Sequence, residues 1–248
     1  MIKPFISICI LTWNRPKFLE ICITNLLGKL FYHENCEILI MDNGSTDQTE
    51  EILKKYSQNS RIRIIRNNRN TGINAYKKLF SAAKGTYVIE IDDDVLEFPT
   101  HFDRTMVEYM NIFTDYGFLA LDVIQNEFTN GAKPNISNYT EDIRDGKVIE
   151  IGPTGGWCSC FRRKDFRKIR IIFNLIPLSF KRCEDGALRG LLKKYLKLNS
   201  GIMKGHFCFH ACGPSYAKQY GYLERDIKKY INSNLLPNAE LYKSYTNK

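Results

Sequence analysis

The stretch Tyr87-Val-Ile-Glu-Ile-Asp92-Asp93-Asp94 decides how the rest of the chain is interpreted. Its apolar and β-branched residues lead straight into three consecutive carboxylates, which is typical of a buried strand that ends at an open crevice. Open α/β sheets bind their ligands at such strand ends. Adjacent carboxylates repel one another, whereas Mg²⁺ or Mn²⁺ prefers oxygen ligands of this kind. The stretch therefore predicts a divalent-metal site, and the alternative is an acidic turn without a ligand.

Three strand, loop and helix units precede this stretch. The predicted strands cover residues 5–11, 37–41, 61–66 and 86–91. Helices are expected to begin near Pro16, at Thr46 or Asp47, and after Gly72, the last of them ending at Gly85. Short alternating units of this kind predict a parallel sheet whose loops gather at its carboxyl edge.

Polar residues follow each of these four strands. They are Thr12, Asn14 and Arg15, then Asp42, Asn43 and Gly44, then Asn67 and Asn68, and finally Asp92, Asp93 and Asp94. Because the carboxyl ends of parallel strands meet at one edge, we expect all four groups to converge on a single crevice. Such a crevice has the composition of a nucleotide pocket with a metal ion at its mouth.

The second half of the chain is less regular. We expect a helix over 99–113, strands over 117–124, 155–163 and 206–210, and helices over 186–195 and 216–236. Residues 125–150 are polar and predict a long loop or hairpin, which is often functional in a compact domain. The fold class expected from the whole pattern is α/β, with a mostly parallel, Rossmann-like central sheet flanked by helices in a single domain.

Composition limits the classes of protein that remain. The chain has 248 residues and a formal net charge of +9, which suits a phosphate-bearing substrate, an anionic membrane surface or nucleic acid. No basic and aromatic stripe is present, so a nucleic-acid partner is not expected. No apolar run approaches the ~20 residues of a membrane span, and the first residues lack a signal-peptide layout. Eight cysteines without a CxxC pair indicate a reduced, cytoplasmic protein without zinc.

The order of the motifs resembles the family 2 glycosyltransferases of the GT-A fold, which are inverting enzymes that use a nucleotide-sugar donor. The matching pieces are Thr12-Trp-Asn-Arg15, Ile40-Met-Asp-Asn-Gly-Ser-Thr-Asp47, Asn70-Thr-Gly72, Gly85 to Asp94, Gly155-Gly156 before Phe161-Arg-Arg163, Glu184-Asp185, and His210 to Ser215. The resemblance implies a GT-A domain over 1–215, with a nucleotide-binding half over 1–95 and an acceptor-binding half over 96–215. Residues 216–248 would form a C-terminal helical extension.

The resemblance implies that Asp42 accepts a hydrogen bond from the imide nitrogen of the donor's base, which favours a UDP-sugar and also allows a dTDP-sugar. The alternative is a turn-forming aspartate, which the following Asn-Gly-Ser also suits. The remaining donor-binding residues implied by the resemblance are Thr12, Asn14, Arg15, Asn43, Gly44, Asn70, Gly72, Asp92 and Asp93.

A divalent metal ion, Mn²⁺ or Mg²⁺, is the cofactor that the resemblance implies. Asp94 and Asp92 would hold the ion against the donor phosphates, and Asp93 would face the ribose or share the ion. His210 would be a further ligand, and its alternative is a histidine packed on an apolar strand.

Inversion at the sugar carbon requires one base to deprotonate the acceptor hydroxyl. Asp185 matches the family's base and Glu184 would support it, although both could merely accept helix N–H groups. Gly155, Gly156 and Trp157 would contact the acceptor, and the alternative for Trp157 is a place in the core.

The expected activity is transfer of a sugar to a saccharide or lipid-linked saccharide acceptor. A nucleotidyltransferase is the first alternative, but it would need a glycine-rich basic loop where this chain has Thr12 to Pro16. The second is a non-catalytic nucleotide-binding module. Residues 218–248 mix aromatic, aliphatic and lysine residues, so they could touch the inner face of a membrane, contact a second subunit, or simply close the domain. The oligomeric state is left open.

Overall fold

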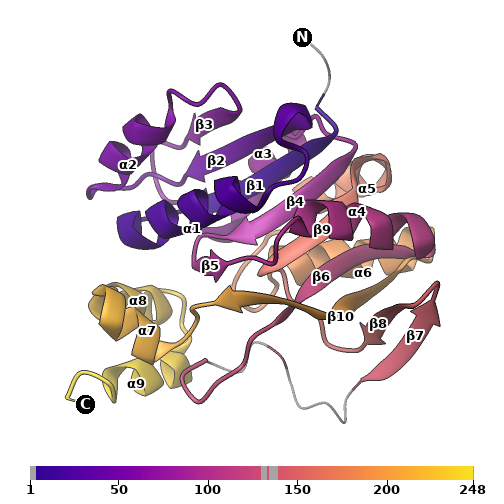
Figure 1. The fold of residues 1–248 in the computed structure, drawn as a ribbon. Helices are drawn as coiled ribbons and strands as arrows, with labels where there is room; N and C mark the ends of the chain where they lie inside the picture. The colour runs from indigo at the N-terminus through magenta and orange to yellow at the C-terminus, as the bar shows by residue number, and fades with distance from the viewer. Residues whose placement is uncertain (1–3, 130–132, 134–138, 248) are drawn as a thin grey trace.

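The computed structural model describes residues 4–129, 133 and 139–247, and a mixed β-sheet forms its centre (Figure 1). Within these residues the strand order is β3-β2-β1-β4-β9-β6-β10-β8-β7, and β5 pairs with β10. The strands are β1 (Ile6–Thr12), β2 (Cys36–Asp42), β3 (Ile62–Arg66), β4 (Tyr87–Asp92), β5 (Val95–Glu97), β6 (Tyr116–Val123), β7 (Thr140–Arg144), β8 (Lys147–Ile151), β9 (Cys158–Arg162) and β10 (Asn199–His210).

The first four strands of the chain are parallel, as the sequence predicts. Their register places Thr12 beside Asp42 and Leu11 beside Asp92, so the polar strand ends lie level with one another. β9 then runs antiparallel between β4 and β6, and β10 is parallel to β6. The sheet is therefore mostly parallel, with antiparallel strands in its second half.

Two layers of helices cover the sheet (Figure 1). One face packs against α1 (Pro16–Lys29), α2 (Thr49–Tyr56) and α4 (Phe102–Ile112), and the other packs against α3 (Ala75–Ala82), α5 (Arg163–Leu175) and α6 (Glu184–Leu196). Successive strand residues point to opposite faces, so Ile8 belongs to the first core cluster and Cys9 to the second. Burial on both faces explains the continuous apolar character of β1, β2 and β4.

Three helices end the chain, where a single helix over 216–236 was expected. They are α7 (Pro214–Tyr220), α8 (Leu223–Asn232) and α9 (Leu236–Lys243). Gly221 and Asn234 have positive φ angles of 83° and 54°, which a helix cannot continue through, and so they separate the three. Tyr222 and Tyr242 pack with Phe18 of α1 in a third core cluster. The C-terminal segment therefore closes over the carboxyl edge of the sheet.

Other boundaries differ from the sequence predictions. α2 begins at Thr49, because the carboxylate of Asp47 accepts hydrogen bonds from the Thr49 backbone and hydroxyl just before the helix. α3 follows a short 3₁₀ turn, Gly72–Asn74, and ends at Ala82, and another such turn covers His33–Asn35. The sequence predicted no helix at α5. Part of 125–150 forms the β7–β8 hairpin, and residues 130–132 and 134–138 lie outside the described part of the chain.

None of the described helices combines the length and apolarity needed to cross a membrane.

Candidate active site

A cavity of about 690 Å³ opens at the carboxyl edge of the sheet. Ten of the sequence-predicted site residues line it: Thr12, Arg15, Asn43, Asn70, Gly72, Asp92, Asp93, Asp94, Glu184 and His210. Three of the four polar groups predicted to converge therefore do so. Asn67 and Asn68 do not line the cavity, and the loop after β3 contributes Asn70 and Gly72 instead. Residues from the C-terminal helices line the same cavity, namely Arg225, Lys229, Tyr230, Asn232, Ser233 and Tyr242.

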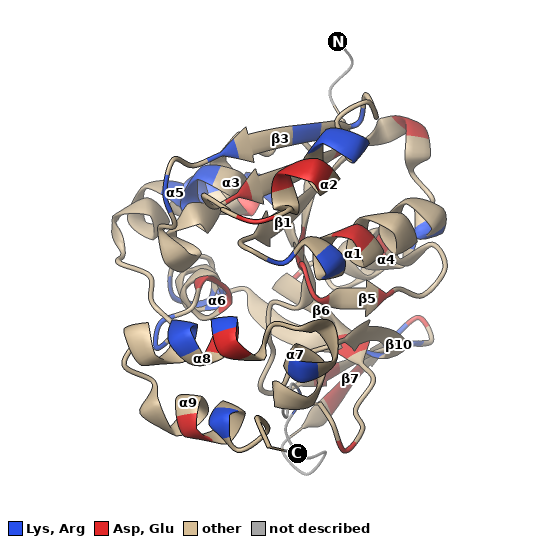
Figure 2. Cartoon of the chain, turned by 90° about the vertical axis from the view of Figure 1, so that its left-hand side faces the viewer, with Lys and Arg blue, Asp and Glu red and all other residues tan. Residues whose placement is uncertain are grey.

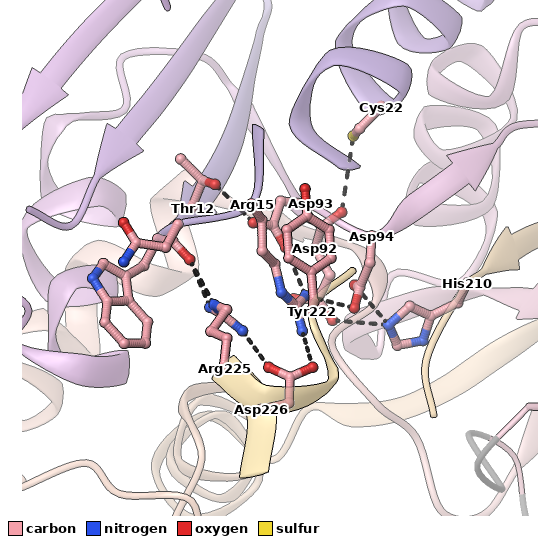
Figure 3. Close-up of polar contacts among 12 residues, drawn as sticks. Thr12, Arg15, Cys22, Asp92, Asp93, Asp94, His210, Tyr222, Arg225 and Asp226 are labelled. Atoms are coloured by element: carbon pink, nitrogen blue, oxygen red, sulfur yellow. Dashed lines mark hydrogen bonds and ion pairs between the residues drawn. The ribbon is translucent and has the colours of Figure 1, made fainter. Parts of the chain in front are cut away.

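Asp92, Asp94 and His210 form a group whose ligand atoms lie within 4.8 Å of one another. His210 Nε2 lies 3.0 Å from Asp94 Oδ1 and 3.6 Å from Asp92 Oδ2 (Figure 3). The antiparallel pairing of β5 with the end of β10 brings His210 to the acidic triplet, more than a hundred residues away in sequence. Two carboxylates and an imidazole suit a divalent ion such as Mn²⁺, so the donor set fits the predicted cofactor.

Asp93 has different partners from its two neighbours. It accepts a hydrogen bond of 2.7 Å from the Thr12 hydroxyl and one of 3.0 Å from Arg15 Nη1. Arg15 Nη1 also lies 2.7 Å from Asp94 Oδ2, and Arg15 Nη2 lies 3.3 Å from Asp226 Oδ2 on α8 (Figure 3). Arg15 therefore joins the acidic triplet to the C-terminal helices.

The charges around the triplet separate the pKa values of its carboxyls. Burial raises the pKa of Asp92 to about 7, against the opposing effect of His210. Burial acts in the same direction on Asp94, but Arg15 and His210 outweigh it and lower the pKa of that carboxyl. Asp94 is thus the member of the group that stays ionised as the pH falls.

Asn43 holds together the two loops that follow β2 and β3. Its amide nitrogen donates to Asn70 Oδ1 at 2.9 Å and to the Gly72 carbonyl at 3.0 Å, and its oxygen accepts from the Thr71 backbone at 3.1 Å. Gly44 has a φ of 77°, and a Cβ there would lie 2.7 Å from the Arg69 backbone. The glycine therefore permits the close contact between the two loops.

Asn14, Asp42 and Gly44 were predicted to bind the donor, but they are not among the residues that line the cavity. Asn14 Oδ1 accepts from the Thr46 backbone at 2.8 Å, and Asp42 Oδ1 accepts from the Ser45 backbone at 3.0 Å. These contacts shape the loop after β2. Direct donor contact by these residues stays a prediction.

Glu184 and Asp185 form the first turn of α6, and both are buried. Asp185 Oδ1 accepts a hydrogen bond of 2.6 Å from the Gly186 backbone. A Cβ at Gly156 would lie 3.1 Å from the Asp185 Cβ and 3.4 Å from Glu90 Oε2, so this glycine lets its loop approach both acids. A Cβ at Gly155 would lie 2.3 Å from the Trp157 ring, so this glycine lets the ring pack against the backbone.

Glu90 is a buried acid near Glu184 and Asp185 that the sequence analysis did not single out. It is fully buried in β4, where Ser159 Oγ donates to its Oε2 at 3.3 Å and no described group bonds Oε1. Burial is the main cause that raises the pKa of Glu90, and burial followed by the Asp185 charge raises the pKa of Glu184 to about 8. A glutamate within an apolar strand is the sequence signal that could have identified it.

Replacing Glu184 with Gln is expected to stabilise the metal-free protein near pH 8 by roughly 1–3 kcal/mol and to have little effect near pH 4. The unfolded chain releases this proton near pH 4.5 and the folded chain only near pH 8, so wild-type stability falls as the pH rises between those values. Thermal unfolding at several pH values in a chelator measures the difference. Glu51→Gln, at an exposed position of α2, is the control. Equal melting curves for wild type and Glu184→Gln at pH 8 would contradict the raised pKa of Glu184.

Trp157 does not line the cavity. The side chain is buried in the first core cluster, its indole nitrogen donates to the Leu121 carbonyl at 3.0 Å, and its ring centroid lies 6.5 Å from that of His210. Because its polar atom is satisfied inside the core, this position does not favour stacking on an acceptor. The core alternative describes Trp157 better, with a role in supporting His210.

The sequence did not predict several of the residues that line the cavity. The Tyr76 hydroxyl lies 3.3 Å from Asp92 Oδ1 and donates to it. Arg225 and Lys229 stand one helical turn apart on α8; Arg225 bonds the Trp13 carbonyl at 2.6 Å and also pairs with Asp226. The sequence shows that Arg225 and Lys229 are four residues apart and so share a helix face, but it does not show that this face lines the cavity.

Lys229 differs from Arg225 in having no carboxylate within 4.0 Å among the described residues. Its ammonium lies 5.0 Å from the Phe180 ring centroid, and Phe180 lines the cavity from the opposite half of the chain. Burial is the main cause that lowers the pKa of Lys229, to about 8. Asp226 opposes this shift, whereas nearby Arg15 and Arg225 add to it. An anionic ligand would relieve this repulsion.

The fold matches that of solved GT-A glycosyltransferases. The mannosyltransferase PcManGT from Pyrobaculum calidifontis, solved with GDP-Man and Mn²⁺, has a TM-score of 0.62 and 14% identity, covering 100% of this chain and 72% of that one. TarS from S. aureus, solved with UDP-GlcNAc, has a TM-score of 0.62 and 16% identity, covering 98% and 71%. At these identities the likeness concerns the fold.

Residues 7–170 match the family described as glycosyl transferase family 2, and the chain belongs to this family. The glycosyltransferase GlyG of Streptococcus pneumoniae is 32% identical over 91 residues, which cover 36% of this chain and 30% of GlyG. This chain thus spans about a third of the length of that relative. The α8 and α9 helices lie beyond the residues that the family description matches.

Proposed function

We propose that this chain is a metal-dependent, inverting glycosyltransferase that uses a nucleoside-diphosphate sugar. The observation that carries the proposal is the Asp92, Asp94 and His210 group in a cavity that the ends of β1 and β4 and the loops after β2 and β3 also line. The acceptor is a hydroxyl of a saccharide or of a lipid-linked saccharide. Membership of the family and the GT-A fold support this assignment.

The donor is proposed to lie along the strand ends, with its base near Asn43, Asn70 and Gly72. A UDP-sugar is favoured because Asp42 carries a second carboxylate oxygen, beyond the one bonded to Ser45, that can accept from an imide nitrogen. Thymine offers the same imide edge, so a dTDP-sugar is the alternative base. The two solved relatives hold GDP-Man and UDP-GlcNAc, so they do not select one base.

Asp92, Asp94 and His210 are proposed to hold Mn²⁺ or Mg²⁺ beside the donor diphosphate. When bound, the ion neutralises the negative charge that develops on the leaving nucleoside diphosphate. Arg225 and Lys229 on α8 provide positive charge from the other wall of the same cavity. Tyr76 holds the Asp92 carboxylate in position through its hydroxyl.

Asp185 is proposed to be the general base. The acceptor oxygen attacks the anomeric carbon, the bond from that carbon to the diphosphate oxygen breaks, and the hydroxyl proton passes to the Asp185 carboxylate. The Gly186 backbone N–H donates to Asp185 Oδ1, and Gly156 lets its loop pass close to the Asp185 Cβ. Asp185 itself is not among the residues that line the cavity, whereas the adjacent Glu184 is. A single displacement of this kind inverts the sugar carbon.

Isothermal titration of UDP with and without Mn²⁺ tests the donor site. We expect binding to weaken at least ~10-fold in a chelator, because the ion would neutralise the diphosphate. In Mn²⁺, Lys229→Ala is expected to weaken UDP binding about 10-fold, since it removes a charged donor from the cavity wall. The matched control is Lys228→Ala, at the exposed neighbouring position on α8.

Equal UDP affinity with and without Mn²⁺ would contradict the proposed function, and equal losses in the two lysine variants would contradict the position of the diphosphate. Mass spectrometry of products from a panel of nucleotide sugars then separates an enzyme from a non-catalytic module. A module would bind UDP and leave every nucleotide sugar intact, whether or not an acceptor is present.

A further inference from the structure

The outward face of α5 combines strong positive charge with exposed aliphatic side chains. Phe166, Ile169 and Phe173 point into the core, whereas Ile171 and Leu175 are 73% and 77% exposed. These two are the most exposed large hydrophobic residues in the described chain. The cations of the helix are Arg163, Lys164, Arg167, Lys168 and Arg170. We call the outward residues 164, 167, 168, 170, 171 and 175 the α5 face.

Few carboxylates neutralise this charge. In the part of the chain that the structure describes, Lys168 is the α5 cation that has a carboxylate within 4.0 Å, at 3.9 Å from Asp165. Asp165 is itself engaged by Arg162 at 2.8 Å. Figure 2 shows Lys and Arg along α5, and the chain adds Lys181 and Arg182 shortly after the helix. The α5 face therefore attracts anions.

The helical positions place the aliphatic pair among the cations. Ile171 and Leu175 are four residues apart, and Lys164, Arg167 and Lys168 precede them by one and two turns on the same face. The apolar surface of these two aliphatic side chains stays exposed in water, and a charged nucleic-acid backbone would not bury it. A bilayer with anionic headgroups satisfies both features, because cations bind its surface while aliphatic groups enter the acyl boundary.

We propose that the α5 face docks this protein on an anionic lipid surface. Residues 218–248, which the sequence also suggested for a membrane contact, are less suited to it. Their Tyr222, Leu223 and Tyr242 side chains are buried in the core cluster around Phe18. Charge complementarity and the two outward aliphatic residues select the occupant. The docking goes beyond the proposed sugar transfer and does not depend on it.

Docking through the α5 face would place the membrane near the cavity. The chain passes from Leu175 at the end of α5 into residues 176–183, of which Phe180 and Cys183 line the cavity. A bilayer held by α5 would therefore lie next to the segment that forms one wall of the active site. If the proposed function is correct, this arrangement suits an acceptor whose lipid tail stays in the membrane.

Flotation of the full chain with vesicles tests the proposal. We expect binding to vesicles of phosphatidylcholine mixed with phosphatidylglycerol and little binding to phosphatidylcholine alone. The double variant Ile171→Ser/Leu175→Ser is expected to bind at least ~10-fold more weakly, since the removed side chains no longer enter the bilayer. Lys164→Gln and Arg167→Gln are each expected to weaken partitioning about five-fold.

Two controls make changes of the same kind at other exposed positions. Leu236→Ser/Leu241→Ser alters exposed leucines of the C-terminal segment, and Lys54→Gln alters an exposed lysine of α2. Both are expected to bind vesicles as the wild type does. UDP titration and thermal unfolding of each variant confirm that the fold and the donor site are retained, so loss of docking is distinguished from loss of function.

Three outcomes would overturn the proposal. The first is no flotation with anionic vesicles, and the second is flotation that the Ile171→Ser/Leu175→Ser change leaves untouched. The third is tighter binding to single-stranded RNA that depends on the cations and not on the aliphatic pair, which would make nucleic acid the partner of this surface.

Discussion

Asp94→Asn is expected to lower metal-dependent sugar transfer by roughly a thousand-fold or more, because the metal contribution to catalysis is several kcal/mol. Asp94 is the carboxylate whose pKa is lowered, against burial, by Arg15 and His210. Its two oxygens lie 2.7 Å from Arg15 Nη1 and 3.0 Å from His210 Nε2. Asparagine keeps the shape of the side chain but removes the charge that a divalent ion requires.

The measurement pairs turnover with direct titration of Mn²⁺, so the result does not rest on activity alone. The control is Asp145→Asn, an exposed residue with a φ of 49° in the β7–β8 turn, where asparagine is readily accommodated. Thermal unfolding shows whether the variant stays as stable as the wild type when Asp93 and Asp226 are the remaining carboxylate partners of Arg15. Wild-type turnover and unchanged Mn²⁺ binding in Asp94→Asn would exclude this carboxylate as a ligand.

Asp185→Asn is expected to leave UDP and Mn²⁺ binding intact while lowering turnover by roughly 10²- to 10⁴-fold, the range for loss of a general base. Asparagine can still accept the hydrogen bond that the Gly186 backbone donates to Asp185 Oδ1, so the first turn of α6 should survive. What the variant loses is a carboxylate able to take the acceptor proton.

Glu184→Gln is the neighbouring comparison, because it removes a buried carboxyl from the same helical turn. Its effect on turnover should be much smaller than that of Asp185→Asn, since Glu184 is assigned a supporting role. Normal sugar transfer by Asp185→Asn would remove Asp185 from the mechanism and leave Glu184 and Glu90 as the nearby acids to test.

Local pattern was sufficient to predict the fold of residues 1–95. The strands before Thr12, Asp42 and Asp92 are apolar on both faces, and a parallel sheet must bring their carboxyl ends to one edge. The convergence of Thr12, Asn43 and the acidic triplet follows from that rule. His210 could be named from the motif order, but its distance from Asp94 could not.

The sequence predicted less about the second half, because its contacts depend on packing between distant segments. The place of Trp157 beside the glycine pair was compatible with both an acceptor contact and a core position, and only the Leu121 carbonyl beside its indole nitrogen distinguished them. Likewise, the apolar residues of α5 were visible, but the exposure of Ile171 and Leu175 was not.

By itself, then, the sequence predicted the order of strands and helices over residues 1–95, the family and an acidic site at the end of β4, because these depend on local periodicity and short motifs. The tertiary structure alone decided that α8 returns to the cavity at the carboxyl edge of the sheet, where Asp226 meets Arg15 from 211 residues away. Helical periodicity specifies which face of α8 is buried and not what it is buried against. That second question is answered by the packing of Tyr222 and Leu223 around Phe18, which places Arg225 and Lys229 at the cavity.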